Sequence, residues 1–199
     1  MNIAVFVSGN GTNLQAIIDA VKSGYIKARI AVVLSDRKDA HAMERAKKAG
    51  VETVFVDPKA HKSREDFDSA IIDCLERREI ELICLAGYMR LLTPAFIRRY
   101  RNRILNVHPA LLPSFKGLNG VKDALDYGVK ITGPTVHFVT EDVDSGPIIA
   151  QSVVQVEDGD TEDSLREKVH KEEHKIYPKA VKDFVEGKLK LKGRRVVRK

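Results

Sequence analysis

Cysteine is scarce in this chain of 199 residues, which contains only Cys74 and Cys84. Each lies in a mainly apolar stretch and neither belongs to a CxxC pair, so we expect two reduced, largely buried thiols in a reducing compartment. No apolar run approaches the length of a transmembrane helix, and no basic leader precedes the first apolar stretch. We therefore expect a cytoplasmic protein with no signal peptide and no membrane partner.

Acidic residues are absent from residues 188–199, which hold seven lysines and arginines. Subtracting these seven charges from the formal net charge of +6 leaves −1 for residues 1–187. Because the main body of the chain is near neutral, its charge argues against nucleic acid as a partner. We expect the basic tail to be a solvated segment, with contact to a phosphate or an anionic partner as the alternative.

Apolar segments of strand length alternate with helical patterns in the first half of the chain. Several of these strands are apolar without alternation, which is typical of parallel strands covered on both faces. Right-handed crossovers then give an α/β fold with a doubly wound, mostly parallel sheet whose carboxyl edge binds ligands. The expected strands are 2–7, 28–34, 51–56, 82–86 and 104–107. One helix is expected to begin at Thr12, and three more are expected over 40–49, 64–78 and 94–101.

The second half of the chain has a different pattern. Residues 108–119 read as a loop rich in proline and glycine, followed by a short helix over 121–127. Strands over 135–139 and 148–156 are close in sequence, which predicts an antiparallel pair. A long helix is expected over 161–186, with a distortion near Pro178. This half therefore forms an antiparallel C-terminal extension of the sheet.

A glycine-rich loop, SGNGTN at residues 8–13, follows the first strand and opens a helix. Free N–H groups at a helix N-terminus beside glycines make a phosphate site, but a tight turn capped by Thr12 or Asn13 is an equal alternative. The loop is no dinucleotide fingerprint, because Leu14 stands at the third glycine position. Asp36 at the end of the second strand leaves only a weak case for NAD.

Asn106 and His108 lie two residues apart at the end of the fifth strand, so they point to the same side of the sheet at its carboxyl edge. An acidic loop over residues 140–147 joins the two expected antiparallel strands and holds Glu141, Asp142 and Asp144. These residues suit either a hairpin loop or a metal site. No calcium-loop spacing and no His or Cys cluster accompanies them, so we expect no metal. We expect His137, on a strand, to be a buried histidine with its hydrogen bonds satisfied.

Eight short motifs occur along the chain in one order that is far more specific than any single motif. They are SGNGTNLQA at 8–16, AGYMRLL at 86–92, NVHPALLP at 106–113, SFKG at 114–117, TVHFV at 135–139, VDSGPII at 143–149, Glu173-His174 and Tyr177-Pro178. On these motifs the chain resembles the folate-dependent formyltransferase family, and within it the short members that act on glycinamide ribonucleotide.

The resemblance implies a Rossmann-like formyltransferase fold and the transfer of a formyl group from 10-formyltetrahydrofolate, a co-substrate, to the amine of glycinamide ribonucleotide in purine biosynthesis. It implies direct amine attack, with an oxyanion stabilised by Asn106 and His108 together with Asp144. The implied residues for the ribonucleotide are Gly11, Thr12, Asn13, Met89, Pro109 and Glu173. The implied folate residues are Met89, Arg90, Leu91, Leu92, Ile97, Val139, Thr140, Glu141, Val143 and Asp144.

The same resemblance divides the single expected domain into three parts. Residues 1–107 form the half that binds nucleotide or phosphate, residues 108–187 the folate-binding and catalytic half, and residues 188–199 the basic tail. The partners are small molecules, and the chain is expected to be a monomer or a homodimer.

Three positions depart from the family pattern. Asn119 stands where relatives commonly have His, Gly120 replaces a larger residue and loosens the start of a helix by about 1 kcal/mol, and His170 stands where a polar amide is often found. The alternatives are formyl transfer to another amine, a hydrolase that releases formate, and a nucleotide-binding module without catalysis. A dehydrogenase is disfavoured by Leu14.

Overall fold

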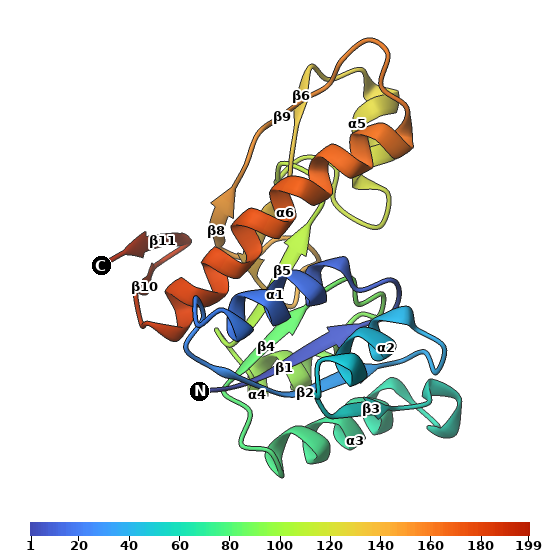
Figure 1. The fold of residues 1–199 in the computed structure, drawn as a ribbon, viewed down its shortest axis with the longest axis vertical. Coiled ribbons are helices and arrows are strands. Elements are labelled where there is room, and N and C mark those ends of the chain that lie inside the picture. The colour runs from blue at the N-terminus through green and yellow to red at the C-terminus, as the bar shows by residue number, and fades with distance from the viewer. The chain divides into compact units, whose positions relative to one another are not determined.

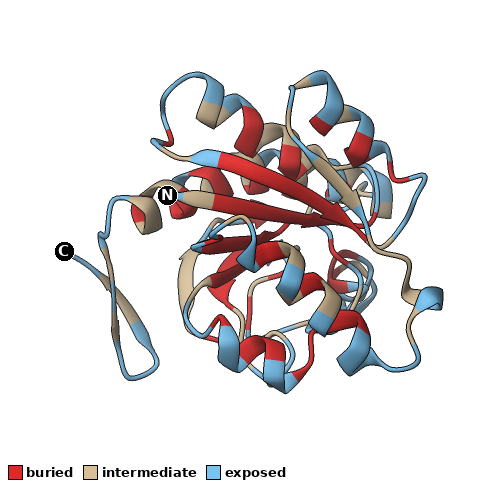
Figure 2. Ribbon diagram, turned by 90° about the horizontal axis from the view of Figure 1, so that it is seen from below, coloured by how far each residue is buried: buried red, intermediate tan, exposed pale blue.

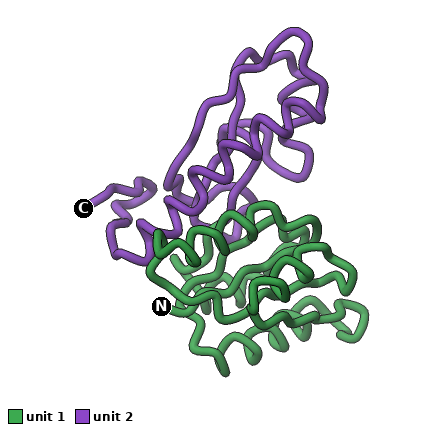
Figure 3. The backbone as a smooth tube through the Cα atoms, viewed as in Figure 1, with its two compact units in different colours: residues 1–105 green, residues 106–199 purple.

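The computed structural model describes residues 1–199, and the chain divides into two compact units, residues 1–105 and residues 106–199 (Figure 3). The first unit alternates strands and helices. Its elements are β1 (Asn2–Val7), α1 (Thr12–Lys22), β2 (Arg29–Ser35), α2 (His41–Lys48), β3 (Thr53–Phe55), the 3-10 helix η1 (Pro58–Ala60), α3 (Arg64–Glu76), β4 (Leu82–Leu85) and α4 (Pro94–Arg99) (Figure 1).

The strands of the first unit pair in parallel, β1 with both β2 and β4, and β2 with β3. Five of the six β1 residues are buried, which explains an apolar run without alternation. The helices covering these strands turn apolar faces inward, as Leu14, Ile17 and Ile18 do on α1. Figure 2 shows the buried strands between helices whose outer surfaces are exposed. The doubly wound pattern expected from the sequence is therefore present.

The second unit adds antiparallel strands and a long helix. Its elements are β5 (Ile104–His108), which begins at the unit boundary, α5 (Gly120–Tyr127), β6 (Ile131–Thr132), β7 (Thr135–Phe138), β8 (Ile148–Gln151), β9 (Val154–Gln155), α6 (Glu162–Val185), β10 (Leu189–Lys192) and β11 (Arg195–Arg198). The central sheet has seven strands in the order β3-β2-β1-β4-β5-β7-β8. β7 and β8 are antiparallel, as predicted, and give the sheet its antiparallel extension.

The prediction of one strand over residues 148–156 was wrong, because two short strands occupy this stretch. β8 pairs with β7, whereas β9 pairs with β6 in a separate two-stranded sheet. The chain leaves β8 at Ser152, whose N–H donates to the carbonyl of Pro134. The long helix was predicted closely: Thr161 caps it in a reciprocal pair with Ser164, and α6 continues through the buried Pro178.

The basic C-terminal segment forms an antiparallel hairpin, and its seven lysines and arginines are exposed. Lys192 pairs with Arg195 across the turn, and Gly193 in that turn has a φ of +57°. Near the other end, Arg198 Nε lies 3.1 Å from Asp183 Oδ2 on α6. Asp183 is buried, so this ion pair anchors the hairpin to α6. None of the helices has the length and apolar character needed to cross a membrane.

Candidate functional site

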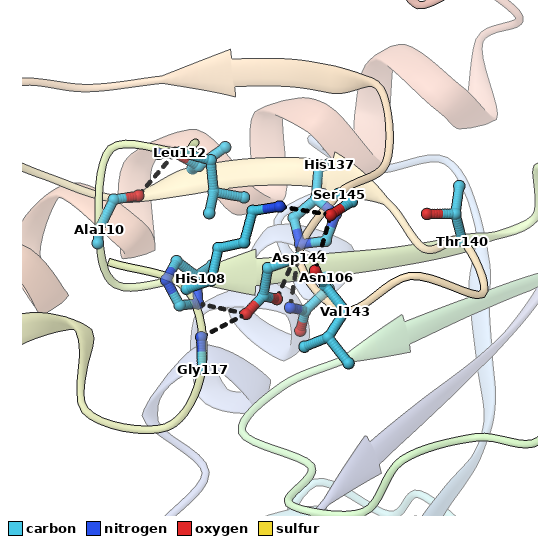
Figure 4. A network of polar contacts seen from close by, with 12 residues as sticks. Asn106, His108, Ala110, Leu112, Gly117, His137, Thr140, Val143, Asp144 and Ser145 are labelled. Atoms are coloured by element: carbon cyan, nitrogen blue, oxygen red, sulfur yellow. Dashed lines mark hydrogen bonds and ion pairs between the residues drawn. The ribbon is translucent and has the colours of Figure 1, made fainter. Parts of the chain in front are cut away.

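Four polar side chains of the second unit form one network (Figure 4). Asn106 and His108 lie at the end of β5, His137 lies on β7, and Asp144 lies in the loop between β7 and β8. His108 Nδ1 is 3.4 Å from Asp144 Oδ2, and His137 Nε2 is 3.6 Å from Asp144 Oδ1. Asn106 Nδ2 is 3.2 Å from His137 Nε2. The three residues predicted as a catalytic trio are thus linked through one carboxylate and one further histidine.

His137 is buried with both ring nitrogens in polar contacts, as expected, because Nδ1 lies 2.9 Å from the carbonyl of Phe138. Its contacts with Asn106 and Asp144 were not predicted from the sequence. The signal that could have found them is the sheet itself, because β7 neighbours β5 and both strands carry polar side chains. His137 therefore belongs to the network rather than to the core alone.

The hydrogen-bond directions in the network follow from its two main-chain acceptors. A carbonyl oxygen can only accept, so His108 Nε2 donates to the carbonyl of Phe115 at 2.8 Å and His137 Nδ1 donates to that of Phe138. His108 Nδ1 and His137 Nε2 are left facing Asp144. Because the Asn106 amide donates to His137 Nε2, a further proton is best placed on His108 Nδ1, opposite the carboxylate.

Burial and charge act in opposite directions on the histidine and the carboxylate. Burial lowers the pKa of His108, and the nearby Asp144 carboxylate offsets this only in part. Burial also raises the pKa of Asp144, but the adjacent His137 ring, the hydrogen bond from the Gly117 N–H and the charge of His108 hold it below its usual value. Asp144 is therefore ionised at neutral pH and is the group that favours the charged form of His108.

The loop that carries Asp144 has an unusual backbone. Asp144 has a φ of +47°, in the left-handed region that non-glycine residues seldom adopt. Two residues later, a Cβ on Gly146 would lie 1.7 Å from the Phe138 carbonyl oxygen. Only glycine allows the two segments to approach this closely, so Gly146 fixes where the loop passes the end of β7.

The glycine loop of the first unit ends in the N-terminus of α1. Gly11, with a φ of +76°, is the N-cap, and no side chain caps the helix. The alternative, a turn capped by Thr12 or Asn13, is not what the structure shows, because α1 begins at Thr12 itself. Backbone N–H groups at this helix end are left without a side-chain cap, which is the arrangement that binds phosphate.

Asp36, which directly follows β2, has a structural role because it contacts the glycine loop. Its carboxylate accepts a hydrogen bond from Ser8 Oγ at 2.6 Å, and Ser8 Oγ accepts one from the N–H of Met89 at 2.9 Å. This bridge ties the glycine loop to the motif at residues 86–92. The position of Asp36 is thereby explained without a ribose.

The remaining residues predicted to bind ligands in the first unit differ in exposure. Met89 and Leu91 are 54% and 61% exposed, an unusual state for apolar side chains, whereas Leu92 and Ile97 are buried. The Arg90 guanidinium stacks 4.9 Å from the centre of the Phe67 ring. Met89 and Leu91 are thus available to a ligand, and Leu92 and Ile97 would act mainly by supporting them.

In the second unit, Val143 is 48% exposed beside Asp144, and Thr140 Oγ1 donates to the carbonyl of Asp142 at 3.2 Å. Val139 and Pro109 are half-buried and Glu141 is exposed. Glu173 on α6 is only 3% exposed, so it is not a solvated helix charge. No three or more His, Cys, Asp or Glu residues are arranged to hold a metal ion.

Comparisons with known proteins agree on one family. A family model described as formyl transferase matches residues 1–181. Phosphoribosylglycinamide formyltransferase of Escherichia coli (strain K12) is 44% identical over 191 residues, 96% of this chain and 90% of that protein. The crystal structure of glycinamide ribonucleotide transformylase 1 from Symbiobacterium toebii has a TM-score of 0.98 at 51% identity, covering 100% of this chain and 93% of that one.

A longer relative matches over one segment only. The trifunctional purine biosynthetic protein adenosine-3 of Bos taurus is 45% identical over 95% of this chain, which spans 19% of that protein. The likeness therefore concerns one part of a multifunctional chain. Because the family model covers most of the sequence and the bacterial relatives match over nearly their whole length, the chain belongs to the formyl transferase family.

Proposed function

We propose that this chain is a phosphoribosylglycinamide formyltransferase, which transfers the formyl group of 10-formyltetrahydrofolate to the amine of glycinamide ribonucleotide. The observation that carries the proposal is the linked set of Asn106, His108 and Asp144 in a chain of this family. Relatives that match over 90% or more of their length bear this enzyme's name. The reaction is a step of purine biosynthesis, and we propose that the enzyme acts in the cytoplasm.

The reaction is a direct acyl transfer. The amine nitrogen of the ribonucleotide attacks the formyl carbon, and the carbonyl oxygen gains negative charge in a tetrahedral intermediate. Asn106 Nδ2 has two hydrogens and uses one toward His137, so the other is free for this oxygen. His108 in its charged form, with its N–H groups directed to the Phe115 carbonyl and to Asp144, stabilises the same oxygen through its positive charge. Preformed donors of this kind stabilise charge that exists only near the transition state.

Asp144 supplies the negative charge that the mechanism needs. Without it, burial would lower the pKa of His108 further and disfavour its charged form. The attacking amine must also lose a proton, and the folate nitrogen must gain one when the carbon–nitrogen bond to the formyl group breaks. Asp144, directly or through water, accepts the first proton, and the His108–Asp144 pair returns one to the leaving nitrogen.

The substrates are assigned to parts of each unit. In the first unit, Gly11, Thr12 and Asn13 bind the phosphate through backbone N–H groups at the α1 terminus, and Met89 flanks the nucleotide. In the second unit, Pro109 flanks the nucleotide and the buried Glu173 binds the glycinamide amine. The folate is assigned to residues 89–92, Ile97, residues 139–141, Val143 and Asp144, with the Arg90 guanidinium meeting a folate carboxylate.

The test is a folate deformylation assay with purified protein, 10-formyltetrahydrofolate and glycinamide ribonucleotide. His108→Ala and Asp144→Asn are compared with Asp142→Asn, a matched change at an exposed position of the same loop. Turnover that requires the amine, collapses in the first two variants and persists in the third is the expected result. Equal turnover without the amine would indicate a hydrolase, and folate binding without turnover would indicate another amine acceptor.

A further inference from the structure

Three consecutive residues, Phe115, Lys116 and Gly117, each bond to a different part of the candidate site. The Phe115 carbonyl accepts from His108 Nε2 at 2.8 Å. Lys116 Nζ donates to Ser145 Oγ at 2.6 Å, and the Gly117 N–H donates to Asp144 Oδ2 at 2.9 Å. We call residues 115–117 the clamp. It joins the loop after β5 to the loop that carries Asp144.

The backbone of the clamp allows these bonds to coexist. Phe115 and Gly117 have φ angles of +51° and +97°, so the chain turns sharply on both sides of Lys116. The turn directs the carbonyl of Phe115 and the N–H of Gly117 toward neighbouring groups of one acid–base pair. Nothing crowds the position of a Cβ on Gly117, so its shape is set by the backbone and these bonds rather than by packing.

Lys116 contributes the side-chain bond of the clamp. Its side chain is exposed, so burial does not explain its placement. Ser145, which it contacts, also donates to the carbonyl of Val143 at 2.9 Å and directly follows Asp144. Since Asp144 has a φ of +47°, its conformation depends on bonds made by its neighbours. The Lys116–Ser145 bond holds the loop immediately beside that residue.

We propose that Lys116 is a positioning residue for the proposed formyl transfer: through Ser145 it keeps the Asp144 carboxylate opposite His108 Nδ1, while the adjoining Phe115 carbonyl retains a proton on His108 Nε2. The inference rests on the proposed function. Lys116 bonds to neither His108 nor Asp144 and acts through the loop. The Phe115 carbonyl holds one proton on His108 Nε2, so His108 gains and loses its other proton at Nδ1.

Titratable groups from β5, from β7 and from its own loop lie near Asp144 in space or in sequence. His108 from β5 and His137 from β7 face its two oxygens, and Glu141 and Asp142 share its loop. When the loop loosens, the carboxylate loses the Gly117 N–H and part of its contact with both histidines. Each lost contact favours the protonated acid, so the pKa of Asp144 rises toward its usual value. The acid limb of activity then moves to higher pH.

The first experiment needs no turnover. Carboxyl carbon and imidazole nitrogen resonances of Asp144 and His108 are titrated by NMR in the wild type, Lys116→Met and Lys116→Arg. Lys122→Met is the matched control, because this exposed lysine bonds to Asp126 on the same helix, outside the network. We expect an Nε2–H tautomer for neutral His108, and in Lys116→Met about threefold tighter proton binding by Asp144, as for loss of one weak polar contact.

The second experiment compares pH–rate profiles. In Lys116→Met the acid limb of kcat shifts upward with KM for the ribonucleotide unchanged, whereas Lys116→Arg and Lys122→Met follow the wild type. An Asp144 titration in Lys116→Met that overlays the wild type, or an Nδ1–H tautomer of neutral His108, would overturn the proposal. Absence of formyl transfer in the wild type would refute the proposed function instead, while the NMR titration would still decide the role of Lys116.

Discussion

Gly146→Ala tests how tightly the Asp144 loop passes the end of β7. The added Cβ would lie 1.7 Å from the Phe138 carbonyl oxygen and 2.8 Å from its carbon. Both atoms are backbone, so a side-chain rotation cannot relieve the overlap. The loop or the strand end must therefore move by more than about 1 Å to reach an ordinary contact distance.

That displacement affects both stability and catalysis. The Phe138 carbonyl accepts the hydrogen bond that fixes His137, and the Phe138 N–H donates to the carbonyl of Pro147 at 2.9 Å. We expect a loss of stability of about 1–3 kcal/mol from overpacking. Because Asp144 lies two residues away, we expect kcat to fall on the order of a hundredfold, the cost typical of an ångström-scale misplacement.

The assay pairs the rate of formyl transfer with urea denaturation. Gly159→Ala is the matched control, because Gly159 is exposed, no atom lies within 4 Å of the added Cβ and its φ is outside the left-handed region. We expect the control to match the wild type in both measurements. A Gly146→Ala protein with wild-type kcat would refute the argument that this contact places the Asp144 loop.

Three further predictions concern other parts of the molecule. Tyr88→Phe removes a buried hydroxyl that has no hydrogen-bond partner, and denaturation should show a gain of about 1 kcal/mol. Gly11→Ala places a Cβ 2.5 Å from the Cβ of Ala42 at a φ of +76°, and should cost roughly 2–4 kcal/mol and raise KM for the ribonucleotide. Burial lowers the pKa of His170 and His174, so the unfolded chain binds their protons more readily. Stability should fall as pH drops below about 6.5, and replacing both by Gln should flatten that dependence.

The parallel half of the fold could be predicted because its signals are local. β1, after its first residue, and β4 are apolar without alternation and buried, which is the pattern of a strand inside a covered parallel sheet. β6 and β9 have two residues each and depend on pairing with each other, which no local pattern reveals. The C-terminal hairpin was not predicted, because the many basic residues suggested a solvated segment. On β10, exposed lysines nevertheless alternate with half-buried apolar residues, which is a strand pattern.

The site was predictable to the extent that side chains define it. Strand alternation placed Asn106 and His108 together, and the family resemblance added Asp144. The partners that fix the histidines are main-chain carbonyls, including that of Phe115, and every residue has a carbonyl. Their direction depends on backbone angles, such as the φ of +51° at Phe115, that a sequence of side chains does not encode. His137 was missed because strand position alone made it a core residue.

Gly120 departs from the family pattern, and the structure gives this departure a second consequence. From the sequence, glycine at this position predicted only a weaker start to α5, at a cost of about 1 kcal/mol. In the structure, a Cβ at this position would lie 3.2 Å from each of His108 Nε2, the Phe115 carbonyl oxygen and the Ala110 Cβ. Any side chain would therefore press on the hydrogen bond that keeps the proton on Nε2. Glycine at this position lowers the stability of α5, but it leaves room for the hydrogen bond between His108 Nε2 and the Phe115 carbonyl, which orients His108.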